Sequence, residues 1–449
     1  MNRPAQTEVQ LIRSSARTPL ALLIAAAVSL GPETARTPAA AQDRPLAGDF
    51  SEICRVGGPT APEWAYFEGR SPVGFDAAGN LHVLDDGGGR IVVVDSHCNL
   101  VRTVGRKGEG PGEFNRAVMF AVWRDGRVAV MDLGHSAYQI FGPGGDFEHF
   151  VRMGTDQGPM GMFSGMRLAI RPDPSGDAVI AQGPPAAMDR MSAAMAQMLG
   201  GGGRDKGVDD RTLERIDLAG DVASATAVLQ SWRVPREASG EPDPADLSDP
   251  SAMMDIMMDM MMDDRIGFEP AFHWDLLPDG TIVWSDSTAY AIKFARPGGP
   301  VQHVLERPFS PEPVTSQLRQ QTIERRLAAL EEKPSDPRVA EAQEIAAALV
   351  PGMEAALRKA IDEMDFHHAV PVVRGLKATW EGGVWVQRRG EEPWDDDGPI
   401  DVFDPERAYL GTLDASSAGI PDAFGPAGLI AYWELDQLDV PTIVLKRLQ

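Results

Sequence analysis

The sequence lacks the short motifs that mark common catalytic centres. It contains no Gly-x-Ser-x-Gly elbow, no His-Glu-x-x-His zinc motif and no Cys-x-x-Cys pair. The glycine-rich segment 105–112 lacks the Gly-Lys-Ser/Thr ending of a phosphate-binding loop and precedes an expected strand, not a helix. We therefore predict no catalytic residue, no metal ligand and no bound cofactor.

Basic residues are scarce relative to acidic ones. The 449-residue chain has 42 lysines and arginines against 66 acidic residues, which gives a formal net charge of −24. A chain this acidic repels a phosphate backbone, so we expect no nucleic-acid partner.

Long hydrophobic runs are also missing after the N-terminus. Leu20–Leu30 is apolar but too short to span a bilayer comfortably. Three arginines precede this run within the first 17 residues, and the small residues Ala39–Ala41 follow it. This order predicts a signal peptide over residues 1–41 and a mature protein that starts at Gln42, in the periplasm or outside the cell. No later run is long enough for a membrane span.

Cysteine is nearly absent: only Cys54 and Cys98 are present. In an oxidising compartment the two could form a single disulfide. They could equally be two small buried apolar side chains, and the sequence leaves both interpretations open.

Glycine (46) and proline (36) are abundant and separate a repeated pattern of short apolar strands. Each unit reads as strand, turn, strand, loop, strand, turn, strand. The units lie at residues 75–105, 121–151, 168–217, 275–294 and 376–413. Such four-stranded sheets bury both faces only by packing radially against neighbouring copies, so the repeat predicts an all-β propeller.

A sixth unit is incomplete, because residues 428–448 supply only two clear strands. The segment 51–57 resembles the outer strand 100–105 of the first unit. We therefore expect the strand over 50–57 to complete the sixth blade. The prediction is a six-bladed β-propeller over residues 42–449, closed by its N-terminal strand.

The first repeat also carries a family resemblance. Residues 75–114, and especially Val-Gly-Arg-Lys-Gly-Glu-Gly-Pro-Gly-Glu-Phe at 104–114, resemble the bacterial exported six-bladed propeller proteins related to NHL repeats. The resemblance covers residues 50–150 closely, extends to 300 and resumes at 370. It implies the fold and export, but most members of that family have no assigned activity.

Three insertions interrupt the repeat, at residues 184–207, 231–266 and 308–366. Their apolar residues recur at helical spacing, and the third insertion should contain two helices. The insertions fall at connections that emerge on one face of a propeller. We expect helical insertions on that face, forming a lid over one mouth of the channel.

Methionine is concentrated in the first two insertions, which hold eleven of the twenty methionines, all within 188–198 and 253–264. Clustered thioethers could bind Cu(I), a soft cation. A methionine stripe at helical spacing is more often a buried helix face, so we favour a structural role.

The channel mouth beneath the predicted lid, where the inner strands begin, is the predicted binding site. Its candidate residues are Arg116, Arg167, Glu269, His273 and His368. We favour an exported, monomeric, non-catalytic binding or scaffolding propeller, whose partner is a small molecule, a peptide or a protein. The alternative is a metal-dependent hydrolase resembling propeller lactonases, which need several channel carboxylates around a divalent cation.

Overall fold

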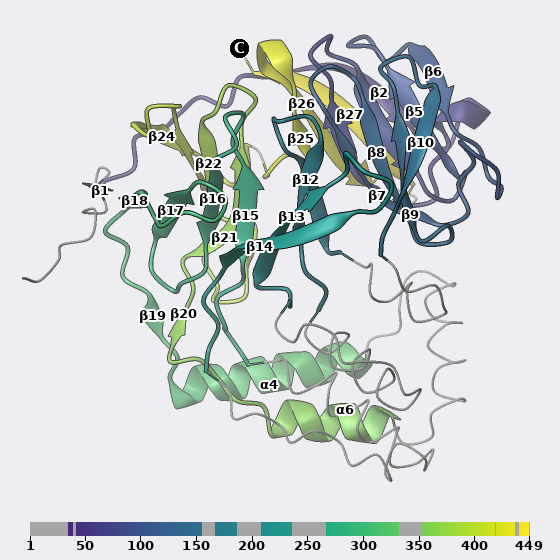
Figure 1. Ribbon diagram of the computed structural model, residues 1–449. Coiled ribbons are helices and arrows are strands. Elements are labelled where there is room, and N and C mark those ends of the chain that lie inside the picture. The colour runs from purple at the N-terminus through teal and green to yellow at the C-terminus, as the bar shows by residue number, and fades with distance from the viewer. Residues whose placement is uncertain are drawn as a thin grey trace, which may run out of the picture. The chain divides into compact units, whose positions relative to one another are not determined.

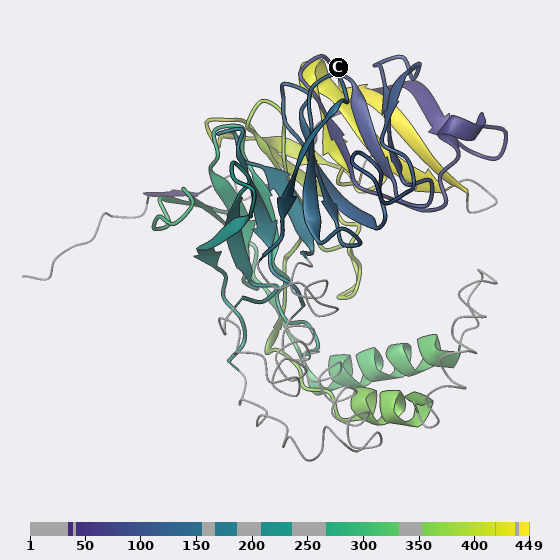
Figure 2. The same ribbon diagram turned by 45° about the vertical axis from the view of Figure 1, so that its right-hand side comes forward.

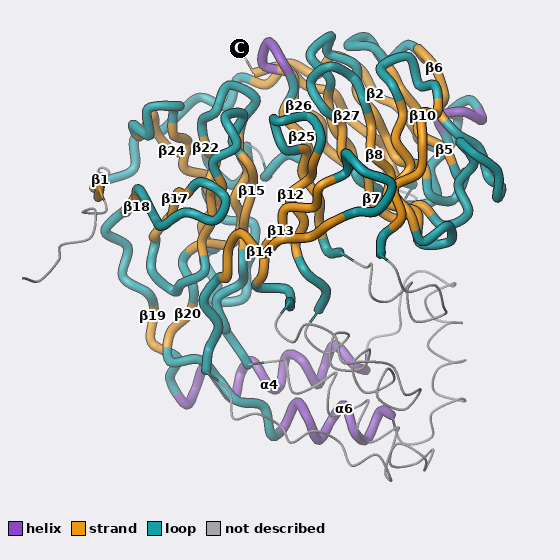
Figure 3. The backbone as a smooth tube through the Cα atoms, viewed as in Figure 1, coloured by secondary structure: helices purple, strands orange, loops and turns teal. Residues whose placement is uncertain are grey.

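The computed structural model describes residues 35–38, 42–154, 167–185, 208–235, 266–331, 353–417, 419–435 and 440–448. Six sheets, each with four antiparallel strands, form the blades of a propeller, and one of them gains a fifth, parallel strand (Figure 1). The predicted six-bladed propeller arrangement is therefore confirmed. In Figure 3 strands dominate the ring, and short turns connect most of them.

The first three blades are continuous in sequence order, with the inner strand first in each. Blade 1 contains β3 (Val73–Phe75), β4 (Leu81–Asp85), β5 (Arg90–Val94) and β6 (Leu100–Val104). Blade 2 contains β7 (Ala117–Val122), β8 (Val128–Asp132), β9 (Ala137–Phe141) and β10 (Phe147–Arg152). Blade 3 contains β11 (Ala169–Pro172), β12 (Ala178–Gln182), β13 (Thr212–Asp217) and β14 (Ser224–Gln230).

Blade 5 is also continuous in sequence, whereas blades 4 and 6 each include a strand from the N-terminal segment. Blade 4 contains β15 (His273–Leu276), β16 (Ile282–Ser285), β17 (Ala291–Ala295) and β18 (His303–Glu306), with β1 (Ala35–Pro38) parallel to β18. Blade 5 contains β21 (Val373–Ala378), β22 (Val384–Arg388), β23 (Ile400–Phe403) and β24 (Tyr409–Leu413). Blade 6 contains β25 (Ala423–Phe424), β26 (Leu429–Leu435), β27 (Pro441–Leu448) and β2 (Phe50–Gly57). Short 3₁₀ turns lie at Glu63–Ala65 and Pro426–Gly428.

The N-terminal strand β2 closes the ring. It pairs antiparallel with β27, with Phe50 opposite Leu448 and Gly57 opposite Thr442. A disulfide joins Cys54 on β2 to Cys98 in the turn between β5 and β6, which links blade 6 to blade 1. The strand β1 falls within the predicted signal peptide, so cleavage after Ala41 would remove it.

The apolar core is divided among the six interfaces between neighbouring blades. Leu81 and Val83 of β4 pack with blade 6, whereas Leu84 of the same strand packs with blade 2. This alternation follows from the two-residue period of a strand, which turns successive side chains to opposite faces of the blade. Each blade therefore buries its two faces only within the complete ring.

The two helices predicted for the third insertion are present, whereas most of the first two insertions lies outside the described residues. The described residues contain two α-helices, α4 (Ser316–Glu331) and α6 (Met353–Asp362), and both belong to the third insertion. The helices lie side by side (Figure 2), and Arg358 of α6 lies 3.3 Å from Glu331 of α4. The methionine segments 188–198 and 253–264 lie outside the described residues, so the shared lid stays a prediction.

The third insertion is fixed to connections that precede inner strands. Val314 and Leu318 pack with Val370 of the short strand pair β19 (Glu312–Pro313) and β20 (Ala369–Val370). The Arg325 guanidinium of α4 lies 5.1 Å from the Trp394 ring, in the loop between β22 and β23. Within the described part of the chain, no helix is long and apolar enough to cross a membrane.

Candidate functional site

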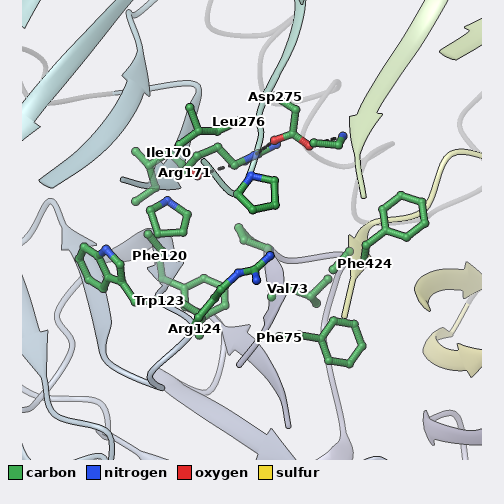
Figure 4. A pocket seen from close by; sticks show the side chains of 18 of the residues that line it. Val73, Phe75, Phe120, Trp123, Arg124, Ile170, Arg171, Asp275, Leu276 and Phe424 are labelled. Atoms are coloured by element: carbon green, nitrogen blue, oxygen red, sulfur yellow. Dashed lines mark hydrogen bonds and ion pairs between the residues drawn. The ribbon is translucent and has the colours of Figure 1, made fainter. Parts of the chain in front are cut away.

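A cavity of about 700 Å³ lies on the propeller axis. All six inner strands contribute to its wall, together with turns that follow several of them. Figure 4 shows apolar side chains from five blades around it: Val73, Phe75, Phe120, Ile170, Leu276 and Phe424. The cavity arises because inner strands of six blades cannot converge to a point, so their edges surround a space.

Tight turns give one end of the cavity its shape. Gly126 follows β7 with φ 90° and Gly280 follows β15 with φ 84°, and both values favour glycine. These turns let each inner strand reverse directly into the second strand of its blade. The side chains just before and after the turns, including Trp123 and Trp380, thereby line the cavity.

A buried carboxylate connects three blades inside the cavity. Arg171 Nε of blade 3 donates a hydrogen bond to Asp275 Oδ1 of blade 4 at 2.7 Å. The backbone N–H of Ala378 in blade 5 donates to Asp275 Oδ2 at 3.0 Å. Burial alone would raise the pKa of Asp275, but Arg171, Lys377 and the Ala378 N–H together hold this pKa below its usual value. Asp275 is therefore a fixed anion in the wall.

Lys377 and Asp422 extend this polar group toward blade 6. Burial lowers the pKa of the Lys377 ammonium and Arg171 lowers it further, against the opposing effect of Asp275 and Asp422. The protein atoms around Asp422 displace much of its water, and this desolvation raises the pKa of its carboxyl group. The Trp433 backbone N–H, which donates to Asp422 Oδ2 at 2.6 Å, offsets part of that rise.

Arg124 crosses the channel. This residue follows β7 of blade 2, yet its guanidinium lies 4.1 Å from the ring centroid of Trp380, which follows β21 of blade 5. Arg124 Nη2 also donates a hydrogen bond to the backbone carbonyl of Trp380. Blades 2 and 5 lie opposite each other in a ring of six. The contact between Arg124 and Trp380 therefore spans the cavity.

The five predicted site residues lie outside this cavity wall. Arg167 pairs with Glu214 at 2.7 Å, and Glu269 lies 3.6 Å from Arg211. Glu269 Oε1 also accepts a hydrogen bond from the Val234 N–H at 3.2 Å. These carboxylates stabilise connections near the strand starts.

The other three predicted residues belong to different segments: Arg116 precedes β7, His273 begins β15 and His368 precedes β20. The Arg116 side chain is exposed, although its backbone N–H donates to Asp132 at 2.8 Å. Burial, together with Arg374 and Arg211, lowers the pKa of His273 to about 4, which keeps this imidazole neutral at physiological pH. His368 is exposed, and its ring centroid lies 4.1 Å from that of His367. A binding role for these residues stays a prediction.

The charged residues of the cavity are not among the predicted site residues. Arg171, Asp275 and Lys377 each stand one residue before the end of an otherwise largely apolar inner strand. This recurrence in three consecutive blades is a signal that a search of the strand ends could have found. The predicted site residues lie at the strand starts instead, because the insertions indicate a ligand beneath them.

Metal-binding groups are not apparent in the described regions. Among those residues, no group of three or more His, Cys, Asp or Glu side chains is arranged to hold a metal ion. The methionine segments considered for Cu(I) lie outside this set.

No protein-family model matches the chain, and no curated protein sequence does either. Similar folds occur among solved structures. A protein from Bacteroides fragilis, named as a putative exported protein, is 9% identical; the match covers 93% of this chain and 100% of that chain, with a TM-score of 0.47. A DUF4221 protein from Bacteroides vulgatus is 10% identical over 89% and 98% of the two chains, with a TM-score of 0.45. A streptogramin B lyase is 9% identical; the match covers 89% of this chain and 97% of the lyase, with a TM-score of 0.36. These similarities do not identify a ligand, an activity or a location for this chain.

Proposed function

We propose that the protein is an exported binding propeller that holds a small organic molecule in the axial cavity. The observation that carries the proposal is the cavity itself. Its volume of about 700 Å³ falls within the range of roughly 300–1,000 Å³ that is typical of small-molecule sites. Apolar walls with a few convergent polar groups are the usual composition of such sites.

The charges in the wall favour a ligand without net charge. Seven ionisable side chains of both signs line the cavity, four basic and three acidic: Arg124, Arg127, Arg171, Lys377, Asp125, Asp275 and Asp422. A strongly charged ligand would meet a group of its own sign nearby. A mostly apolar molecule with one neutral polar group fits both the aromatic wall and these side chains of mixed charge.

The hydrogen bonds of the channel carboxylates favour binding over the metal-dependent hydrolase alternative. Both oxygens of Asp275 already accept hydrogen bonds, and Asp422 Oδ2 accepts one from Trp433. Asp275 and one oxygen of Asp422 therefore serve to fix the wall. The proposed export is supported by the disulfide between Cys54 and Cys98, because disulfides persist mainly in oxidising compartments.

A cavity-filling variant tests the proposal. A Cβ at Gly74, in the cavity wall, would meet no atom closer than Val122 Cγ2 at 3.5 Å, so Gly74→Leu should fold and narrow the cavity. Thermal-shift screening of small aromatic alcohols and amides should find compounds that stabilise the wild type. At 100-fold excess over the dissociation constant the gain is about 2.7 kcal/mol.

The matched control is Gly220→Leu, at an exposed turn where a Cβ meets only backbone of Val222 at 3.8 Å. Gly220→Leu should keep the stabilisation and Gly74→Leu should lose it. Equal stabilisation of both variants would place the ligand elsewhere and refute the proposal.

A further inference from the structure

We propose that Lys377 captures an aldehyde or ketone in the axial cavity by forming an imine with it. This inference rests on the proposed function, because the carbonyl compound must first occupy the cavity. It names the chemical class of the ligand and the atom that binds it, Lys377 Nζ.

The strand places Lys377 in the cavity wall. Its neighbours Leu376 and Ala378 pack in the apolar core between blades 4 and 5. Because side chains alternate along β21, Lys377 is directed to the other face of this strand, toward the channel and blade 6. The cavity lining includes both Lys377 and Asp422, which begins the inner part of blade 6.

The neighbouring carboxylate does not neutralise Lys377 by direct contact. Both oxygens of Asp275 are engaged, one by Arg171 at 2.7 Å and the other by the Ala378 N–H at 3.0 Å. Lys377 Nζ makes no hydrogen bond or ion pair with any residue that the structure describes. An ammonium group without a partner is costly in such surroundings, so the neutral amine is favoured there.

Asp422 supplies the complementary group. Burial raises the pKa of its carboxyl group and lowers that of the Lys377 ammonium, so burial acts on both groups in the direction of their uncharged forms. An amine nucleophile and a proton donor are the two groups that imine formation requires. Arg171, which is held by Asp275, adds a positive charge that disfavours protonation of Lys377.

The chemistry balances without an oxidant or reductant. The Nζ lone pair attacks the carbonyl carbon, and a proton moves from nitrogen to oxygen to give a carbinolamine. The Asp422 carboxyl group protonates the hydroxyl, which leaves as water as the C=N bond forms. The resulting iminium returns its N–H proton to Asp422, so amine and carbonyl have become imine and water.

Reductive trapping tests this step with benzaldehyde as the probe. Its aromatic ring matches a wall that contains Phe75, Phe120 and Phe424 (Figure 4). The full protein is incubated with benzaldehyde and sodium cyanoborohydride, and the benzylated lysines are located by peptide mass spectrometry. Lys377 should be the first lysine modified, and benzyl alcohol, which has no carbonyl group, should compete.

Two substitutions keep the test independent of folding. Lys377→Met removes the amine, and Lys377→Arg keeps a positive charge but cannot form the imine, so both should lose the selective label. Lys359→Met, on the exposed face of α6, is the matched control and should keep it. Asp422→Asn should retain reversible binding of benzyl alcohol but slow the labelling of Lys377.

The outcomes separate this inference from the proposed function. Selective labelling that both Lys377 variants abolish supports the imine. Labelling spread over surface lysines, with benzyl alcohol still binding the wild type and failing to bind Gly74→Leu, overturns the imine alone. Spread labelling without any binding of benzyl alcohol overturns the imine and counts against the cavity as a binding site as well.

Discussion

Asp76 shows how one side chain shapes a hairpin next to the channel. Its carboxylate accepts hydrogen bonds from the backbone N–H and side-chain amide of Asn80, at 2.9 and 2.8 Å, and lies 3.3 Å from His82 Nε2. Burial alone would raise the pKa of Asp76, but these hydrogen bonds outweigh it and lower the pKa to about 2. The ionised carboxylate therefore stabilises the turn between β3 and β4.

We predict a pH-dependent loss of stability from this group. The folded pKa lies below the unfolded value of about 3.9, so the stabilisation is complete above about pH 4 and disappears as the pH falls to about 2. Asp76→Asn should cost about 2 kcal/mol at pH 7, and this difference should shrink toward pH 2. Urea unfolding at a series of pH values measures both effects.

Asp95→Asn is the control for this prediction. Asp95 makes the same two hydrogen bonds to Asn99, at 2.9 and 3.0 Å, but in an exposed turn. The control should change the free energy of unfolding less than Asp76→Asn does. Equal losses of unfolding free energy in the two variants would show that the burial of Asp76 does not add to the stability of its turn.

Arg307 forms the most deeply buried ion pair described. It lies 2.7 Å from Asp401, both side chains are fully buried, and Asp43 approaches the same guanidinium at 2.9 Å. Arg307→Met keeps much of the side-chain volume but leaves the longer, 3.4 Å contact to Arg388 Nε as the only described ion pair of the buried Asp401. The expected cost is about 3–5 kcal/mol in denaturant unfolding.

Arg296→Met provides the comparison for Arg307. Arg296 lies 2.9 Å from Asp279, but these side chains are 50% and 58% exposed, so the loss should stay below about 1 kcal/mol. A similar small loss for Arg307→Met would mean that the buried pair does not stabilise the interface between blades 4 and 5.

At the scale of elements, β2 and its disulfide hold the ring closed. Without β2, the outer edge of β27 would present unpaired backbone groups, which invites association with other chains. Cys54 and Cys98 lie 44 residues apart in sequence. A covalent link across a loop of this length removes considerable entropy from the unfolded chain.

The variant Cys54→Ala/Cys98→Ala should therefore lose about 4 kcal/mol of unfolding free energy and aggregate more readily on heating. Reducing the wild-type protein should reproduce the loss, whereas the double variant should not respond to reductant. Unchanged stability in both experiments would contradict a role for the disulfide in ring closure.

At the scale of the whole molecule, the N-terminal segment runs along two blades before it joins a third. The Leu46 N–H donates to the Thr412 carbonyl at 2.9 Å, and Thr412 N–H donates to the Arg44 carbonyl at 2.8 Å. The segment therefore extends the outer edge of blade 5, while Asp43 reaches the buried Arg307 and Arg388 at 2.9 and 2.6 Å. Residues 43–57 thus stabilise blade 5 and complete blade 6.

Much of this architecture could be predicted because its causes are local. The alternation of Leu81, Val83 and Leu84 specifies a two-faced strand, and Gly126 or Gly280 specifies the turn that follows an inner strand. The relationship to NHL repeats and the predicted export depend on resemblance and on an N-terminal pattern, so they stay predictions.

The candidate site could not be predicted in the same way. Arg171 and Asp275 are separated by 104 residues, and Arg124 and Trp380 by 256. No local periodicity relates such positions, because their contacts depend on the curvature of the closed ring. The predicted site residues consequently lie at strand starts near the insertions, whereas the cavity wall consists largely of inner-strand ends and the turns beyond them.

The sequence by itself determined the blade, its turns and the number of blades, because the hydrophobic period and the glycine positions act over a few residues. Only the tertiary structure decided between a disulfide and two separate thiols, since that depends on the distance between Cys54 on one blade and Cys98 on the next. The tertiary structure also determined which charged side chains lie together around the propeller axis. Lys377, Asp275 and Asp422 come from three blades, and closure of the ring around an open centre gathers them about one cavity.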